Sequence, residues 1–178
     1  RKADHIEICI KENVKANVTT GFEDVRLIHN AIPELNLDEI KTKTNFFGKD
    51  ISAPLMFAAI TGGHATTKLI NENIASVAQQ LNIPIGIGSQ RAALEDESLK
   101  NTYRNVRDTA PDVFLVGNVG ISQIIDNGIE LVQRSIEMIE ANAIAIHCNV
   151  LQELVQPEGD RKFRGALDAL QKISESID

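Results

Sequence analysis

Polar residues and glycines follow four short apolar stretches of the sequence. They form the groups Thr61-Gly62-Gly63, Gly88-Ser89-Gln90-Arg91, Gly117-Asn118-Val119-Gly120 and His147-Cys148-Asn149, the last of which is followed by Gln152 and Glu153. Together these groups offer hydroxyls, amides, one arginine, one histidine and one carboxylate. Glycines let a flat or phosphorylated ligand approach the main chain closely. We therefore take the four groups as a candidate binding site.

Strands and helices in alternation would carry these groups. The apolar stretches cover residues 55–60, 83–87, 113–116 and 143–146. Each is almost continuously apolar, which is typical of strands that are buried on both faces of a parallel sheet. Their centres lie about 28 to 30 residues apart, which fits one βα unit. Apolar residues at helical spacing predict helices over residues 70–81, 99–106, 129–139 and 166–177.

Residues 1–53 differ from the rest and are interpreted as a lead-in to the βα units of residues 54–178, all within a single domain. Residues 4–11 have the apolar spacing of a helix, and residues 42–46 and 49–52 could form a hairpin. Four βα units fit either a doubly wound sheet or the first half of an eight-fold barrel. In both architectures the active site lies at the carboxyl edge of the sheet, where we expect the polar groups to meet.

Each candidate residue also has a purely structural interpretation. Thr61-Gly62-Gly63 could be a simple turn from strand to helix, and Asn118 could cap the next helix. His147 could be a core histidine, and Glu153 could be an exposed residue of a first helical turn. Cys148 is more simply a small core residue than a nucleophile. The functional interpretation therefore depends on all four groups lying together.

The composition excludes several classes of protein. The chain has 178 residues, with 18 Lys and Arg against 25 Asp and Glu, so its formal charge is −7. An acidic chain without a basic block is a poor binder of nucleic acid. We expect no membrane partner and a cytoplasmic location, because the sequence has neither a long apolar run nor a signal peptide. The two cysteines lack disulfide or metal-ligand spacing, and the phosphate-loop, serine-hydrolase and zincin motifs are absent.

Several motifs match one known family in order and spacing. They are Arg1-Lys2-Ala3-Asp4-His5-Ile6, Ala59-Ile60-Thr61-Gly62-Gly63, Gly88-Ser89-Gln90, Asn118-Val119-Gly120, His147-Cys148-Asn149-Val150-Leu151-Gln152-Glu153 and Gln156-Pro157-Glu158-Gly159-Asp160. On these motifs the chain closely resembles the type 2, FMN-dependent isopentenyl-diphosphate isomerases. The resemblance implies a (β/α)8 TIM barrel that interconverts isopentenyl and dimethylallyl diphosphate without net redox change. It also implies reduced FMN, Mg²⁺, NADPH as the source of reducing equivalents, and a homo-oligomer, either a tetramer or an octamer.

The resemblance also implies a role for each matching residue. Flavin contacts are carried over to Ala59, Ile60, Thr61, Ser89 and Asn118. Diphosphate contacts are carried over to Arg1, Lys2, His5, Gln90 or Arg91, His147 and Asn149. Gln152 and His147 are the catalytic candidates, and Glu153 would ligate Mg²⁺. Since a neutral amide is no strong acid or base, we expect Gln152 mainly to orient the substrate.

Length is the main departure from the family, whose members are about twice as long as this chain. We therefore expect the chain to be the first half of such a barrel, without the FMN phosphate site that these barrels build after their last strands. We also expect it to be inactive alone. Two alternatives remain open: an FMN-dependent 2-hydroxy acid oxidase or dehydrogenase on the same barrel, and a non-catalytic truncated module that binds flavin or phosphate.

Overall fold

A short parallel sheet forms the centre of the computed structural model, which describes residues 2–59, 61–157 and 159–177. Its strands are β3 (Ile85–Gly86), β4 (Leu115–Gly120) and β5 (Ala143–His147), in the order β3-β4-β5. Ile85 is in register with Leu115, and Gly120 with His147. The parallel sheet that the sequence predicts is therefore confirmed, and its strands end at the predicted polar groups.

Of the first predicted strand, 55–60, the described residues 55–59 form a single parallel bridge, between Phe57 and Ile85. The Gly86 N–H donates to the Phe57 carbonyl at 2.8 Å, and the Gly88 N–H donates to the Thr61 carbonyl at 3.0 Å. The chain therefore runs parallel to β3 at this edge, as expected. The strand order follows the sequence, and no reversal marks a switch point in the part of the chain that the structure describes.

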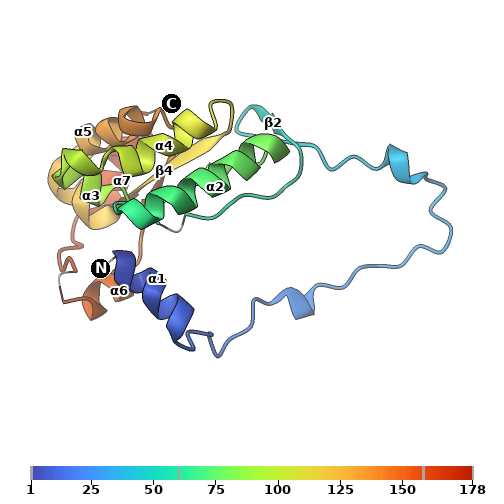
Figure 1. The fold of residues 1–178 in the computed structure, drawn as a ribbon, viewed down its shortest axis with the longest axis horizontal. Coiled ribbons are helices and arrows are strands. Elements are labelled where there is room, and N and C mark those ends of the chain that lie inside the picture. The colour runs from blue at the N-terminus through green and yellow to red at the C-terminus, as the bar shows by residue number, and fades with distance from the viewer. Residues whose placement is uncertain (1, 60, 158, 178) are drawn as a thin grey trace.

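Burial on both faces was a wrong prediction for β4, for β5 and for the edge at Leu55. In β4, fully buried residues alternate with half-buried ones, while all five residues of β5 are only half-buried. Leu55, at the opposite edge, is 63% exposed. The reason is that the helices pack in a single row, with α2 on α4, α4 on α5 and α5 on α7, so that they cover the sheet from one side (Figure 1).

The helices lie where the apolar spacing predicts them. They are α2 (Ala65–Leu81), α4 (Asn101–Thr109), α5 (Ile121–Ile139) and α7 (Ala166–Ser174). Apolar spacing did not predict the short elements α3 (Arg91–Glu95), a 3-10 turn (Glu97–Leu99) and α6 (Val150–Val155). Both short helices directly follow predicted polar groups, so they contribute to the rim of the candidate site. No helix in the described ranges has the length and apolar character to cross a membrane.

The lead-in consists of a helix, a long arm and a hairpin. Helix α1 (Lys2–Lys11) and the hairpin strands β1 (Thr44–Phe46) and β2 (Lys49–Ile51) confirm the predictions. The hairpin is attached to the sheet by Phe46, whose ring packs edge-on against Phe114 at 5.1 Å. Residues 12–43 run between α1 and the hairpin as an exposed arm, which contains only 3-10 turns at Phe22–Asp24 and Leu37–Glu39 (Figure 1).

A buried arginine joins the starts of β4 and β5. Arg107, at the end of α4, is 8% exposed, and burial lowers the pKa of its guanidinium. Its nitrogens donate to five oxygens at 2.9 to 3.2 Å, namely the carbonyls of Ala110, Pro111, Val113 and Glu140 and the Asn142 side chain. The same Asn142 oxygen accepts the Leu115 N–H at 2.9 Å. One cation therefore fixes the two loops that enter the neighbouring strands.

We expect Arg107→Met to lower the free energy of unfolding by about 3 kcal/mol, because it leaves several buried acceptors without donors. Urea unfolding followed by circular dichroism measures this loss. Arg104→Met is the matched control, since Arg104 makes ion pairs with Asp108 and Glu140 at the surface, where such pairs contribute about 0–1 kcal/mol. Equal losses in the two variants would contradict the assigned role of Arg107.

Candidate active site

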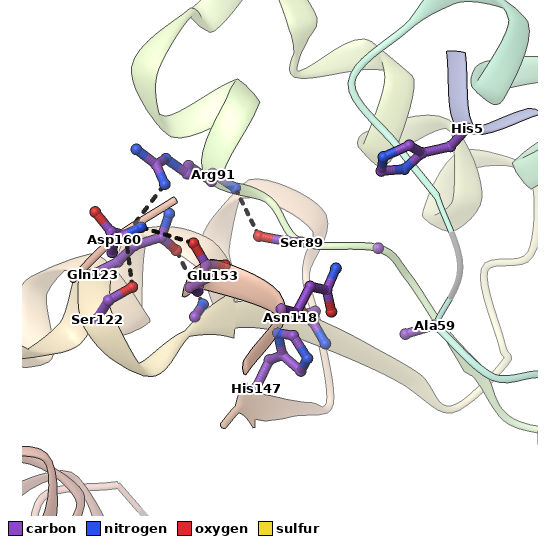
Figure 2. A pocket seen from close by; sticks show the side chains of 13 residues that line it. His5, Ala59, Ser89, Arg91, Asn118, Ser122, Gln123, His147, Glu153 and Asp160 are labelled. Carbon is purple, nitrogen blue, oxygen red and sulfur yellow. Dashed lines mark hydrogen bonds and ion pairs between the residues drawn. The ribbon is translucent and has the colours of Figure 1, made fainter. Parts of the chain in front are cut away.

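A polar cavity of about 250 Å³ lies at the carboxyl edge of the sheet (Figure 2). Its wall combines strand ends with α1, α3, α5, α6 and the segment that follows α6. The lining residues are His5, Ala59, Gly88, Ser89, Arg91, Asn118, Gly120, Ser122, Gln123, His147, Gln152, Glu153 and Asp160. All four predicted polar groups therefore contribute to the site or to its immediate support.

Most of the predicted site residues meet in this cavity. Its wall includes eight of them: His5, Ala59, Ser89, Arg91, Asn118, His147, Gln152 and Glu153. Arg1, Ile60 and the side chain of Lys2 lie outside the part of the chain that the structure describes. Thr61, Gln90 and Asn149 are described, but they are not part of the wall.

The three predicted residues outside the wall are engaged within the protein. Thr61 is 6% exposed, and Gln90 is fully buried behind the rim. Asn149 caps α6, where its side chain accepts the Gln152 N–H at 3.0 Å and donates to the Gln152 side chain at 3.2 Å. Of the alternatives Gln90 and Arg91, it is Arg91 that lines the cavity. Cys148 is exposed, so its interpretation as a core residue was wrong.

Buried side chains of the helices hold the first rim turn from behind. Asn71 of α2 donates to the carbonyls of Thr61 and Thr102, at 3.4 and 3.2 Å. The Thr102 hydroxyl accepts the Gly63 N–H at 3.0 Å. Asn71 and Thr102 are 4% and 8% exposed, so these bonds are shielded from water. The turn that follows Ala59 is thus fixed by α2 and α4.

Tyr103 connects this first rim turn to the second. Its ring is fully buried, and its hydroxyl donates to the Ser89 carbonyl at 2.8 Å. A Cβ at Gly62 would lie 2.0 Å from the ring carbon Cε1, and one at Gly63 would lie 2.8 Å from the hydroxyl oxygen. The two glycines therefore make room for a tyrosine of the same chain, and not for the ligand that the sequence predicts beside them.

Two other rim positions also require glycine because of the packing inside the protein. A Cβ at Gly88 would lie 2.6 Å from the Thr61 carbonyl carbon, because the two chains run close together there. A Cβ at Gly117 would lie 2.7 Å from the Gln90 side-chain oxygen. Gly88 nevertheless lines the cavity, as does Ala59, so the main chain itself forms part of the wall.

A charged network lies at one end of the cavity (Figure 2). Arg91 donates to Glu95 at 2.8 Å and to Asp160 at 3.2 Å. Asp160 also accepts the Ser122 hydroxyl at 2.7 Å, and its N–H donates to a Glu153 carboxylate oxygen at 3.0 Å. The hydrogen bond with Glu95 raises the pKa of Arg91, and burial opposes this effect only in part. The guanidinium therefore stays charged.

Three lining residues escaped the sequence analysis: Ser122, Gln123 and Asp160. Asp160 belonged to a quoted motif but received no role. Ser122 and Gln123 directly follow the third rim group, and Gln123 accepts the Gly120 N–H at 3.0 Å. Their place at the start of α5, pointing back to the carboxyl edge of the sheet, is the signal that could have identified them.

The described wall offers hydrogen-bond donors, acceptors and exposed main chain, but no cluster that could enclose a metal by itself. Among the described residues, no group of three or more His, Cys, Asp or Glu side chains is placed to hold a metal ion. The wall offers the carboxylates of Glu153 and Asp160, the guanidinium of Arg91 and two histidines. The Asn118 side chain has no hydrogen-bond partner within the described parts of the chain, so its amide is available to a ligand.

Parallel strands with a polar cavity at their carboxyl edge define an α/β protein of the kind that binds cofactors at this edge. The chain belongs to the FMN-dependent dehydrogenase family, whose model matches residues 4–113. It is 51% identical over 99% of its length to the isopentenyl-diphosphate delta-isomerase of Methanosarcina mazei. It is 47% identical over 99% of its length to that of Archaeoglobus fulgidus, and 48% identical over its whole length to that of Pyrococcus abyssi.

These relatives confirm the resemblance that the motifs indicated. The chain spans about half the length of each of them, 49% of the Methanosarcina mazei protein, 51% of the Archaeoglobus fulgidus protein and 50% of the Pyrococcus abyssi protein.

Tyr103 is the single tyrosine of the sequence, so tyrosinate absorbance reports on it alone. Burial raises its pKa far above the ordinary value of about 10. The neutral form is favoured in the folded state, so its contribution to stability is complete below about pH 10 and is lost as the pH rises further. We expect tyrosinate absorbance in an alkaline titration of the chain without flavin to appear only when the chain unfolds.

Tyr103→Phe is the matched variant, since it keeps the ring beside Gly62 and removes only the hydroxyl. We expect its free energy of unfolding to be about 1 kcal/mol lower at neutral pH, from the lost hydrogen bond to Ser89. Above about pH 10 it should fall less steeply than that of the unaltered chain. Tyrosinate absorbance that rises at about pH 10 while circular dichroism still shows a folded chain would refute the assigned burial.

Proposed function

We propose that this chain forms half of an FMN-dependent isopentenyl-diphosphate delta-isomerase, which interconverts isopentenyl and dimethylallyl diphosphate. One observation carries the proposal. Eight residues from separate segments, to which the resemblance assigns flavin, substrate or metal contacts, line a single cavity. The names of the relatives support the same reaction. Because they are about twice as long, the activity belongs to a protein with a second half.

The second half would close the sheet into a barrel. Strand β5 has no partner on its outer side among the described strands. Beside it lies an apolar hollow of about 890 Å³, formed with α7 and with Phe47 and Phe114. A following strand would pair with β5, and the last strands would reach the edge at Phe57. Such a (β/α)8 barrel would also supply the FMN phosphate site, which lies after its last strands.

The described wall suits the flat ring of FMN. Ala59 and Gly88 bring the main chain to the surface of the cavity without a large side chain between. Asn118 presents an amide that can both donate and accept hydrogen bonds. Ser89 lies on the neighbouring rim turn, and Thr61 supports that turn through its carbonyl. When bound, reduced FMN would supply an electron-rich ring and an acidic N–H beside the reacting carbons.

The diphosphate and Mg²⁺ would occupy the charged end of the cavity. Arg91, His5 and His147 are the basic side chains of the described wall. Arg91 lies in the charged network, whereas Figure 2 shows His147 beside Asn118 and His5 on the opposite side, above Ala59. Glu153 offers Mg²⁺ a single carboxylate, and Mg²⁺ commonly completes its shell with substrate phosphates and water. By the resemblance, Arg1 and Lys2 would add positive charge to the diphosphate site. Gln152, whose side-chain oxygen accepts a hydrogen bond from Asn149, would orient the substrate rather than exchange protons with it.

The isomerisation moves a proton between two carbons of an alkene, so it needs a site that excludes water and holds the hydrocarbon still. The two carboxylates of the wall, Glu153 and Asp160, are engaged in the network with Arg91 and Ser122, so we assign orientation and charge, not proton transfer, to the described residues. NADPH would serve only to bring the flavin to its reduced form. Assembly into a tetramer or octamer remains a prediction from the resemblance.

The proposal is tested with a protein that joins this chain to a second half of the length seen in its relatives. Reduced FMN, Mg²⁺ and isopentenyl diphosphate should give dimethylallyl diphosphate, detected by proton NMR. Lactate with oxidised FMN is the competing substrate, because a 2-hydroxy acid dehydrogenase on the same barrel would oxidise it. Flavin binding with lactate turnover, or flavin binding with neither reaction, would refute the isomerase.

Two substitutions separate the metal from the flavin. Glu153→Gln removes the charge that Mg²⁺ needs, so we expect a loss of activity of at least about a hundredfold with FMN affinity changed less than about twofold. Asn118→Ala removes an amide that faces the ring, and we expect FMN affinity to fall about tenfold. Fluorescence titration of FMN and the Mg²⁺ dependence of the rate measure the two effects. Similar effects of both changes on flavin affinity would contradict this division.

A further inference from the structure

Gln90 and Asn118 are joined by two hydrogen bonds between neighbouring rim turns. The Gln90 N–H donates to the Asn118 carbonyl at 2.8 Å. In return, the Asn118 N–H donates to the Gln90 side-chain oxygen at 3.1 Å. Both polar groups of the Asn118 main chain are therefore bound to one residue. Asn118 lines the cavity, whereas Gln90 does not.

The other end of the Gln90 amide is anchored in α5. Its side-chain nitrogen donates to the Ser135 carbonyl at 2.8 Å and lies 3.6 Å from the sulfur of Met138. The side chain is fully buried, so both of its polar atoms are engaged away from the cavity. Gln90 therefore links the second rim turn, the third rim turn and α5.

The surroundings of this amide leave it little freedom. Gly117 precedes Asn118, and a Cβ there would lie 2.7 Å from the Gln90 oxygen and 2.8 Å from Ile144. A buried amide whose donor and acceptor are both matched has one strongly preferred orientation. Because Gln90 binds both polar groups of the Asn118 main chain, its fixed amide also fixes that main chain. The position of the main chain in turn determines where the Asn118 side chain points into the cavity.

We infer that Gln90 is a positioning residue that acts on the flavin through Asn118, and not a ligand of the substrate. The inference rests on the proposed function for the identity of the planar ligand. On this inference, the side chains of the second rim turn point in two directions. Ser89 and Arg91 face the cavity, while Gln90 between them faces the protein and fixes the next strand end.

The experiment uses the protein with its second half and compares the dissociation constant of FMN with the KM of isopentenyl diphosphate. Gln90→Met keeps the length of the side chain and removes both hydrogen bonds of the amide. We expect it to weaken FMN binding about tenfold and to leave the KM within about twofold. Gln90→Glu keeps an acceptor for the Asn118 N–H, so it should recover most of the affinity that Gln90→Met loses.

A double-mutant cycle shows whether the effect passes through Asn118. In an Asn118→Ala background, Gln90→Met should weaken FMN binding by no more than about twofold, because the side chain that it misplaces is already gone. Asn105→Ala is the matched control. Asn105 is a buried amide of α4 that donates to the Lys68 carbonyl at 3.0 Å and does not line the cavity. It should leave FMN affinity unchanged even though it lowers the melting temperature.

The possible outcomes separate the inference from the proposed function. A raised KM with unchanged FMN affinity in Gln90→Met would make Gln90 a substrate ligand and overturn the inference. Equal tenfold effects of Gln90→Met with and without Asn118 would also overturn it, as would equal losses in Gln90→Met and Asn105→Ala. If Gln90→Met does not fold, Gln90→Glu decides, since an affinity loss as large as that of Asn118→Ala would refute the role. An unaltered protein that binds FMN without isomerising the substrate refutes only the proposed function.

Discussion

The turns that follow the parallel strands depend on buried polar side chains for their hydrogen bonds. Within a sheet, each main-chain group finds its partner on the next strand, but beyond the last register pair that partner is missing. An unpaired buried N–H or carbonyl costs about 1–3 kcal/mol. Here four side chains take the place of the missing strand partners: Asn71, Gln90, Thr102 and Tyr103. The shape of the site therefore depends on buried side chains that lie between the sheet and the helices.

This constraint explains why the rim is rich in glycine. The supporting side chains need space next to the main chain that they bind, and a Cβ would fill it. Gly62 leaves room for the Tyr103 ring, and Gly117 for the Gln90 amide. On the cavity side, the same lack of side chains exposes the main chain to a ligand. Glycine at the rim therefore allows both the support from behind and the approach of a ligand from the cavity.

The sequence predicted the elements better than their environment. Apolar spacing located the main helices, because a helix that covers a sheet must repeat its apolar face every three or four residues. It overestimated burial at β5, because the helices cover the sheet from one side and no described strand pairs with the outer edge of β5. It also named Gln90, as an alternative to Arg91, for contact with the diphosphate, since a polar residue after a strand can point toward the cavity or toward the helices. That direction depends on Ser135 and Asn118, which are distant in sequence.

The site residues show the same division. Glu153 was named because it stands in a family motif, and Arg91 because it directly follows one, since a charged side chain at a strand end or in a first helical turn also has an ordinary structural use. Tyr103 was identified only as part of a weak helix. Its role depends on the two glycines 40 and 41 residues before it, and only the fold brings them together. Residues that act by supporting others leave no local motif, so a sequence alone reveals the ligand-facing layer first.

Charge determines how this edge could accept a diphosphate. Arg91 already bonds two carboxylates, Glu95 and Asp160, so a phosphate group would have to compete with them for the guanidinium. Glu153 and Asp160 both line the cavity and would repel the incoming anion. A divalent cation between Glu153 and the diphosphate reverses this repulsion, because it is attracted to both. Without a metal, the carboxylates of Glu153 and Asp160 would disfavour binding of the diphosphate. The acidic wall is therefore a reason to expect that a metal binds together with the proposed substrate.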